Sequence, residues 1–246
     1  MANEQEFYSK LWQKSSDYFY SNGVYLWMCS KIKKYKIILE IGTGTGQGTL
    51  SLLDTEHKVI SVEKNKFCIE RAKSLLENKG YKVGSVESNL DECDVILLNI
   101  DLLSSELTSY LKNICFDLVI CWNVGSYCNK EMIQYYIPYM LEYGLTIEQI
   151  RSNLESSYAE LIIWRACKIA SDKKVPIHII DRALEKITKG KDMYFIVLKK
   201  EFGYSEIKYD NKKTKALSGR GINLTVKGNK CDNEVINIYL NSILIK

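Results

Sequence analysis

The residues with the clearest chemistry are three glycines at alternate positions, Gly42, Gly44 and Gly46. They belong to the run Glu-Ile-Gly-Thr-Gly-Thr-Gly-Gln-Gly at residues 40–48, which follows a short β-branched segment. Glycine allows the chain to turn sharply and lets backbone N–H groups approach a bound molecule closely. The spacing therefore predicts a loop that holds a nucleotide-like group against the main chain.

This loop does not match the fingerprint of dinucleotide-binding proteins, which is G-x-G-x-x-G. Counted from Gly42, the last glycine of that pattern would fall on Gln47, and counted from Gly44 it would fall on Thr49. Both registers fail. The mismatch disfavours a cofactor that contains a pyrophosphate.

A carboxylate, Glu63, ends the next apolar run and lies 19 residues beyond Gly44. In an α/β protein an acid at the end of the second strand can accept two hydrogen bonds from a ribose diol, and it would repel a 2′-phosphate. The alternative for Glu63 is a solvated acid at a strand end. The preceding glycine loop favours the ribose interpretation.

With the strands around it, the pattern E-x-G-x-G-x-G resembles the first motif of the Rossmann-like class I methyltransferases, which use S-adenosylmethionine (SAM) and release S-adenosylhomocysteine. The resemblance covers about residues 36–125. It implies that SAM is the cofactor and that Glu40, Gly42, Thr43, Gly44, Gly46 and Glu63 belong to its site.

The resemblance also implies an acid after the third strand, against the adenine amino group. We favour Asp101, with Leu102 beside it, because it closes the apolar run at 94–100. In a rival register residues 81–86 form the third strand and Glu87 is the acid. Asp101 could instead cap a helix, since serines follow it closely.

The sequence does not identify a catalytic residue or a methyl acceptor. The fourth strand ends at Trp122-Asn123, where enzymes that methylate amino groups carry Asn/Asp-Pro-Pro-Tyr/Phe, and no proline follows here. Asn123 could contact the methionine end of SAM. Candidate substrate contacts are Tyr20, Tyr25, Trp122 and His178. His178 could be a general base, but a single imidazole with no identified partner favours a buried core histidine.

Cysteine and histidine patterns give no support for a metal or a redox centre. The eight cysteines form no C-x-x-C pair, and no cluster of histidine and acidic residues has metal-ligand spacing. The first residues are polar and acidic, and no apolar run approaches the length of a membrane span. We expect a cytoplasmic protein whose cysteines are mostly buried thiols.

The elements that must position these residues alternate between strand and helix. The alternation predicts an α/β fold: a doubly wound, mostly parallel seven-stranded sheet with an antiparallel C-terminal edge and an N-terminal helical cap. We expect the cap at residues 1–34, the SAM-binding domain at 35–230 and a C-terminal extension packed on it at 231–246. Within the domain we expect a helical insertion at about 130–170 and closing strands at 193–201, 205–209 and 222–226.

Composition and charge fit an ordinary globular protein, with 46% hydrophobic and 26% charged residues and a net charge of +4. Residues 186–230 hold twelve basic and four acidic side chains, so the positive charge is concentrated there. The sequence thus predicts methyl transfer from SAM to a small-molecule or otherwise undetermined acceptor. One alternative is an RNA or DNA methyltransferase that uses the basic segment, and another is a non-catalytic SAM-binding module.

Overall fold

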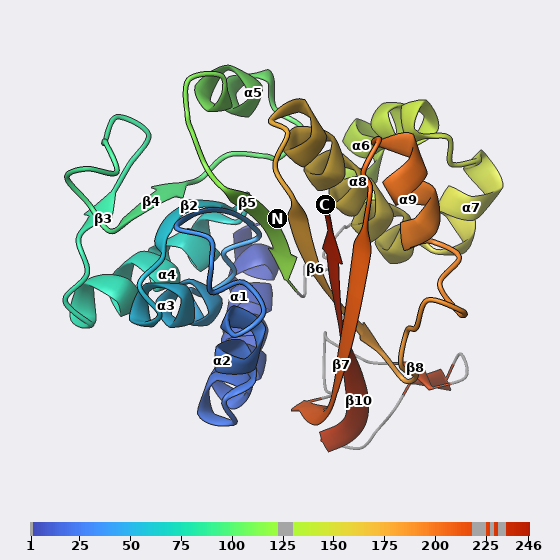
Figure 1. Ribbon diagram of the computed structural model, residues 1–246, viewed down its shortest axis with the longest axis horizontal. Helices are drawn as coiled ribbons and strands as arrows, with labels where there is room; N and C mark the ends of the chain where they lie inside the picture. The colour runs from blue at the N-terminus through green and yellow to red at the C-terminus, as the bar shows by residue number, and fades with distance from the viewer. Residues whose placement is uncertain (1, 123–129, 218–224, 227–228, 231–234) are drawn as a thin grey trace.

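A single eight-stranded sheet organises the chain, in the order β3-β4-β2-β1-β5-β6-β10-β7 (Figure 1). The structure is a computed structural model that describes residues 2–122, 130–217, 225–226, 229–230 and 235–246. The strands of this sheet are β1 (Ile37–Ile41), β2 (Lys58–Val62), β3 (Val83–Gly84), β4 (Val95–Leu98), β5 (Leu118–Trp122), β6 (Ile177–Ala183), β7 (Ile207–Leu217) and β10 (Val235–Ile245). A separate pair consists of β8 (Thr225–Val226) and β9 (Asn229–Lys230).

The sheet confirms the predicted doubly wound α/β architecture. Strands β3, β4, β2, β1, β5 and β6 pair in parallel, whereas β10 is antiparallel to both β6 and β7. Strand β1 lies between β2 and β5, so the order of the strands reverses there. In open α/β sheets such a switch point opens a crevice at the carboxyl ends of the strands, where ligands bind.

Helices cover both faces of the sheet, which explains why its central strands are apolar on both sides. One layer holds α1 (Ala2–Ser21), α2 (Val24–Cys29), α3 (Gln47–Asp54) and α4 (Lys66–Asn78). The other holds α5 (Ser105–Leu111), α6 (Lys130–Tyr143), α7 (Ile147–Ser152), α8 (Leu154–Asp172) and α9 (Phe195–Glu201). Alternate strand residues enter different cores: Leu39 and Ile60 pack in the second layer's core, and Ile38 and Val59 in the first's.

The helical region expected at about 130–170 contains three helices, α6, α7 and α8. Helix α7 begins at Thr146, whose hydroxyl accepts a hydrogen bond from the Gln149 N–H while the Gln149 side chain accepts one from the Thr146 N–H. This capping box satisfies two backbone donors at the start of the helix. No helix among the described residues has both the length and the apolar character needed to cross a membrane.

The expected closing strands are partly wrong. Residues 195–201 form helix α9, because the Asp192 carboxylate accepts the N–H groups of Tyr194 and Phe195 and so starts a helical turn. Of residues 222–226, only Thr225–Val226 is a described strand, and it lies outside the main sheet. The strand expected at 205–209 continues to Leu217.

The C-terminal residues are also placed differently from the expectation. Residues 235–245 do not pack on the domain as an extension but form β10, which lies between β6 and β7 in the sheet. Ile236, Ile238 and Leu240 alternate along it and are buried in the core beneath α1 and α2. The sheet thus has eight strands instead of seven, counting the two-residue β3.

Candidate functional site

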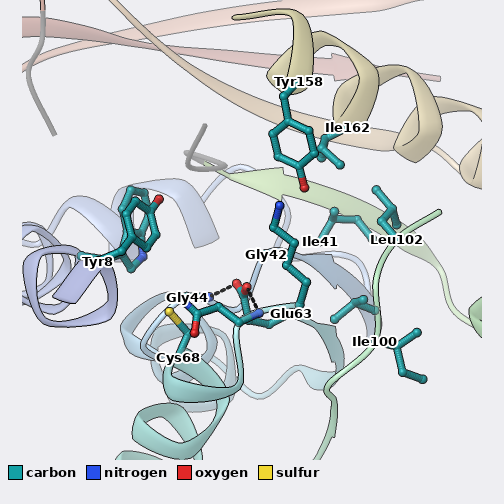
Figure 2. A pocket seen from close by; sticks show the side chains of 14 residues that line it. Tyr8, Ile41, Gly42, Gly44, Glu63, Cys68, Ile100, Leu102, Tyr158 and Ile162 are labelled. Atoms are coloured by element: carbon teal, nitrogen blue, oxygen red, sulfur yellow. Dashed lines mark hydrogen bonds between the residues drawn. The ribbon is translucent and has the colours of Figure 1, made fainter. Parts of the chain in front are cut away.

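A pocket lies at the carboxyl ends of β1, β2 and β4, between α1 and α8 (Figure 2). The lining comes from four regions far apart in the sequence: α1, the glycine loop with β2 and α4, the segment after β4, and α8. The lining residues are Tyr8, Trp12, Ile41, Gly42, Gly44, Val62, Glu63, Lys64, Asn65, Cys68, Ile100, Leu102, Tyr158 and Ile162. Its position matches the crevice expected from the strand order.

Two of the three glycines form the floor of this pocket. Gly42 has φ 87° and donates its N–H to the Val62 carbonyl at 2.8 Å. Gly44 has φ 54° and donates its N–H to Glu63 Oε2 at 3.1 Å. Both backbones lie in the left-handed region, which glycine adopts without the steric cost of a side chain. The loop is therefore fixed against the end of β2 by hydrogen bonds from its own main chain.

Helix α1 packs directly on this loop. A Cβ placed on Gly44 would lie 2.2 Å from Trp12 Nε1, so only glycine leaves room for the indole. Hydrogen bonds anchor both ends of the helix. Near its start the Gln5 carbonyl accepts from Asn65 Nδ2 at 3.1 Å, and near its end Asp17 Oδ1 accepts from Gln47 Nε2 at 2.6 Å. The predicted N-terminal helix thus forms one wall of the pocket.

Glu63 is the carboxylate that faces the pocket. Its Oε1 accepts the Asn65 N–H at 2.8 Å and its Oε2 accepts the Gly44 N–H, as the dashed lines of Figure 2 show. Burial raises the pKa of Glu63, and the two backbone hydrogen bonds oppose that shift. A carboxylate has about four acceptor positions, so Glu63 can still accept hydrogen bonds from a bound molecule.

Asp101 does not line the pocket, although its neighbours Ile100 and Leu102 do. Its Oδ1 accepts the Leu103 N–H at 2.8 Å, and its Oδ2 accepts the hydroxyl of Tyr136 from α6. The favoured strand register holds, because β4 pairs with β2 from Val59↔Val95 to Val62↔Leu98. Here the carboxylate caps a turn and contacts α6, and its direct role against adenine stays a prediction. Glu87, the rival candidate, is exposed and also lies outside the pocket lining.

Lys64 and Tyr158 belong to the pocket and were not predicted. Lys64 Nζ lies 4.0 Å from the ring centroid of Tyr158 and 5.1 Å from that of Tyr136. Burial raises the pKa of Tyr158 well above its usual range, so the phenol is neutral. Lys64 follows Glu63 directly, but no sequence signal connects it to an α8 residue almost a hundred positions later.

Comparison with known proteins finds only distant structural similarity. No family model matches the chain, and no curated protein matches it. Solved structures that resemble it include TehB from Haemophilus influenzae, at 13% identity over 94% of this chain and 66% of that one, with a TM-score of 0.49. Magnesium protoporphyrin IX methyltransferase (ChlM) from Synechocystis PCC 6803, solved with bound SAM, is 11% identical over 90% of this chain and 76% of that one, with a TM-score of 0.43. EvdMO1 is 15% identical over 90% of this chain with a TM-score of 0.47, and this chain spans only 39% of EvdMO1.

The strand order decides the fold class. Strands β2, β4 and β3 lie on one side of β1, and β5 and β6 lie on the other. The antiparallel strand β10 then lies between β6 and the edge strand β7. The chain has a doubly wound, Rossmann-like α/β fold with an antiparallel C-terminal edge. The glycine loop after β1 and the acid after β2 face one crevice, where Gly44 donates its N–H to Glu63.

Three residues predicted for the cofactor site pack on the side of the glycine loop that faces away from the pocket, and they do not line the pocket. Gly46 has φ 92°, and a Cβ there would lie 2.9 Å from Ala72 Cα of α4. Thr43 bonds the Ser61 hydroxyl. Glu40 is buried and accepts hydrogen bonds from Thr49 Oγ1 at 2.6 Å and Ser61 Oγ at 2.5 Å. Burial raises the pKa of Glu40 to about 7, although these two hydroxyls lower it.

The four predicted substrate contacts lie elsewhere in the fold. Tyr20 is exposed, with its hydroxyl 3.5 Å from Asp54 Oδ2. Tyr25 is buried and packs edge-on against Phe19. Neither residue, nor Trp122 or His178, contributes to the pocket lining.

His178 is a neutral core histidine, which corrects its candidate role as a base. Trp122 Nε1 donates to His178 Nδ1 at 2.9 Å, so the ring proton lies on Nε2, which bonds Ser242 Oγ at 2.8 Å. Burial lowers the pKa of His178 to about 3. Asn123 lies outside the described residues. Within the described part of the chain, no group of three or more histidine, cysteine or acidic residues could hold a metal ion.

Proposed function

We propose that this protein is a SAM-dependent methyltransferase. The observation that carries the proposal is the convergence of the Gly44 backbone and the Glu63 carboxylate on one pocket, beside the apolar side chains of Ile100 and Leu102. A carboxylate next to bare main chain suits a ribose diol, and an apolar slot beside it suits a flat base. These residues fit the adenosyl part of SAM.

The side chains around this site would position a bound molecule and exclude water. Gly42 and Gly44 let it approach the backbone, Glu63 would hold the ribose, and Ile100 and Leu102 would flank the adenine. When bound, SAM supplies a methyl group on a positively charged sulfur. Aromatic faces attract such a cation, and Tyr8, Trp12 and Tyr158 line the two sides of the pocket. Transfer then depends mainly on orientation and desolvation.

We propose a small molecule as the acceptor. The pocket lies between α1 and α8, and none of its lining residues belongs to the basic segment 186–230. Two described lysines of that segment already have partners in ion pairs, Lys191 with Glu185 and Lys208 with Glu206. A nucleic-acid acceptor would require the basic segment to act at a distance from the pocket.

Calorimetric titration with S-adenosylhomocysteine tests the cofactor, with NAD as the control ligand. We expect binding of S-adenosylhomocysteine and none of NAD. Absence of S-adenosylhomocysteine binding would refute the proposal. Formation of S-adenosylhomocysteine from SAM in the presence of pooled small metabolites tests transfer, and binding without any turnover would favour the non-catalytic alternative. Binding of single-stranded RNA that weakens steeply with salt would favour the nucleic-acid alternative.

A further inference from the structure

Arg182 is a cation that contacts Trp12, a residue of the α1 wall of the pocket, although Arg182 does not itself line the pocket. The proposed cofactor contacts do not use it. It lies at the carboxyl end of β6, opposite Leu240 of β10. Alternation along the strand turns it to the same face as Ile180, which packs in the core under α1 and α2. Its guanidinium carbon lies 5.4 Å from the ring centroid of Trp12.

The contact with Trp12 connects Arg182 to the glycine loop. The Trp12 indole packs against Gly44 and lines the pocket, so one aromatic ring contacts both the loop and the arginine. Tyr8, one helical turn before Trp12, also lines the pocket and is an electrostatic neighbour of Arg182. The positive charge therefore lies beside the α1 wall of the pocket.

No carboxylate among the described residues forms an ion pair with Arg182. Asp181 precedes it in the chain, but a strand turns consecutive side chains to opposite faces, and Asp181 Oδ2 accepts a hydrogen bond from Asn241 Nδ2 at 3.4 Å. Arg182 is half-buried, and this burial lowers the pKa of its guanidinium. A partly desolvated cation without a close counter-ion is costly, and a negatively charged ligand would offset that cost.

We propose that Arg182 binds a carboxylate of the molecule held in the pocket. The inference rests on the proposed function. With the ribose at Glu63, the amino-acid end of SAM would run along Gly44 toward Trp12, and that end carries a carboxylate. An acceptor with a carboxyl group is the other source of the same chemistry. A guanidinium suits either, because its planar donors match the two oxygens of a carboxylate.

Two ligands separate these sources: S-adenosylhomocysteine, which has the amino-acid carboxylate, and 5′-methylthioadenosine, which lacks it. If Arg182 binds the cofactor carboxylate, Arg182→Met lowers the affinity for S-adenosylhomocysteine by about tenfold or more. The same variant lowers the affinity for 5′-methylthioadenosine by less than about twofold. Calorimetry measures both affinities. Arg182→Lys retains the charge and restores part of the affinity. The matched control is Lys212→Met, which removes a cation 5.8 Å from the Trp27 ring, outside the pocket.

If the acceptor supplies the carboxylate, Arg182→Met leaves both affinities unchanged. Acetate then raises the melting temperature of the wild-type protein saturated with S-adenosylhomocysteine, but not that of the saturated variant. Equal weakening of both ligands would mean that Arg182 only supports Trp12, and would overturn the proposal. No change in either affinity together with no acetate effect would also overturn it. Failure of the wild type to bind S-adenosylhomocysteine would instead count against the proposed function.

Discussion

At the scale of single residues, two glutamates at neighbouring strand ends have different roles because their surroundings differ. Glu40 is buried behind the glycine loop and is held by two hydroxyls, whereas Glu63 faces the pocket and is held by two backbone N–H groups. We therefore expect the first to act on the stability of the fold and the second on ligand binding. Each assignment can be tested separately.

Glu63→Ala removes the carboxylate from the pocket and leaves the Gly44 N–H without its acceptor. We expect S-adenosylhomocysteine to bind more weakly by about 1 to 3 kcal/mol, the cost of leaving buried hydrogen-bonding groups without partners. Calorimetry measures the change. Glu87→Ala is the matched control, since Glu87 is an exposed acid outside the pocket lining. Equal affinities of the wild type and Glu63→Ala would contradict the ribose assignment.

The raised pKa of Glu40 predicts that the stability of the fold depends on pH. Burial raises its pKa from 4.5 to about 7, so between these values the folded chain binds more protons than the unfolded chain and its free energy of unfolding falls as pH rises. Glu40→Gln removes this titration. As pH rises from 4.5 to 7, we expect the free energy of unfolding of the variant to increase relative to that of the wild type, by roughly 3 kcal/mol over the whole range.

Urea unfolding of both proteins at pH 5 and pH 8 measures the Glu40 effect. Burial also raises the pKa of other acids, among them Glu63 and Asp181, but these groups are common to both proteins and their effects cancel in the difference. An identical pH dependence of wild type and Glu40→Gln would show that Glu40 is charged in the folded state throughout this range.

At the scale of elements, the contact between α1 and the glycine loop decides the shape of the pocket. Trp12 fits against Gly44 only because that residue has no Cβ. The polar contacts of Asp17 and Gln5 then hold α1 in register with α3 and the start of α4. Disturbing the loop should therefore disturb the helix above it.

Gly44→Ala tests this coupling, with Gly23→Ala as a control. Both glycines have positive φ, 54° and 64°, but a Cβ on Gly23 would meet no atom within 4 Å. Both variants incur backbone strain of about 1 kcal/mol. Only Gly44→Ala also displaces Trp12, so we expect it to lower the melting temperature further and to weaken S-adenosylhomocysteine binding.

The double variant Trp12→Ala/Gly44→Ala completes the test. Removing the indole removes the clash, so the two substitutions should cost less stability together than the sum of the single changes. Additive losses would show that Gly44 and Trp12 act independently.

At the scale of the whole molecule, the C-terminal strand joins the edge of the sheet to the parallel strands. Strand β10 pairs along its whole length with β7 and over seven positions with β6. The edge strand β7 therefore has β10 as its only neighbour in the described sheet. Folding of the domain should depend on residues close to the end of the chain.

Leu240→Ala measures the contribution of β10. Leu240 is fully buried in the core beneath α1 and α2, so we expect a loss of about 2 to 5 kcal/mol in the free energy of unfolding. Val235→Ala on the same strand is the control, because Val235 is 43% exposed, and it should cost far less. Urea unfolding compares the two. Similar small losses would mean that β10 is peripheral, as an appended segment would be.

The sequence by itself determined the parallel half of the sheet and the position of its candidate ligand site. Buried parallel strands are short, continuous apolar runs, and the glycine loop and Glu63 lie directly at the ends of two of them, so local patterns carry the information. The capping box of Thr146 and Gln149 is also a local sequence pattern. Helix α9 was misread because its apolar residues suit either element, and only the contacts of Asp192 select the helix.

Only the tertiary structure decided which side chains face the pocket and where the last strand lies. Asp101 turns to Tyr136, and His178 enters the core with Trp122 and Ser242. Trp12 and Tyr158 line one pocket from distant elements, and Arg182 contacts Trp12. The pairing of β10 between β6 and β7 likewise joins segments far apart in the chain. Such placements depend on long-range packing, which one sequence read in local windows does not contain.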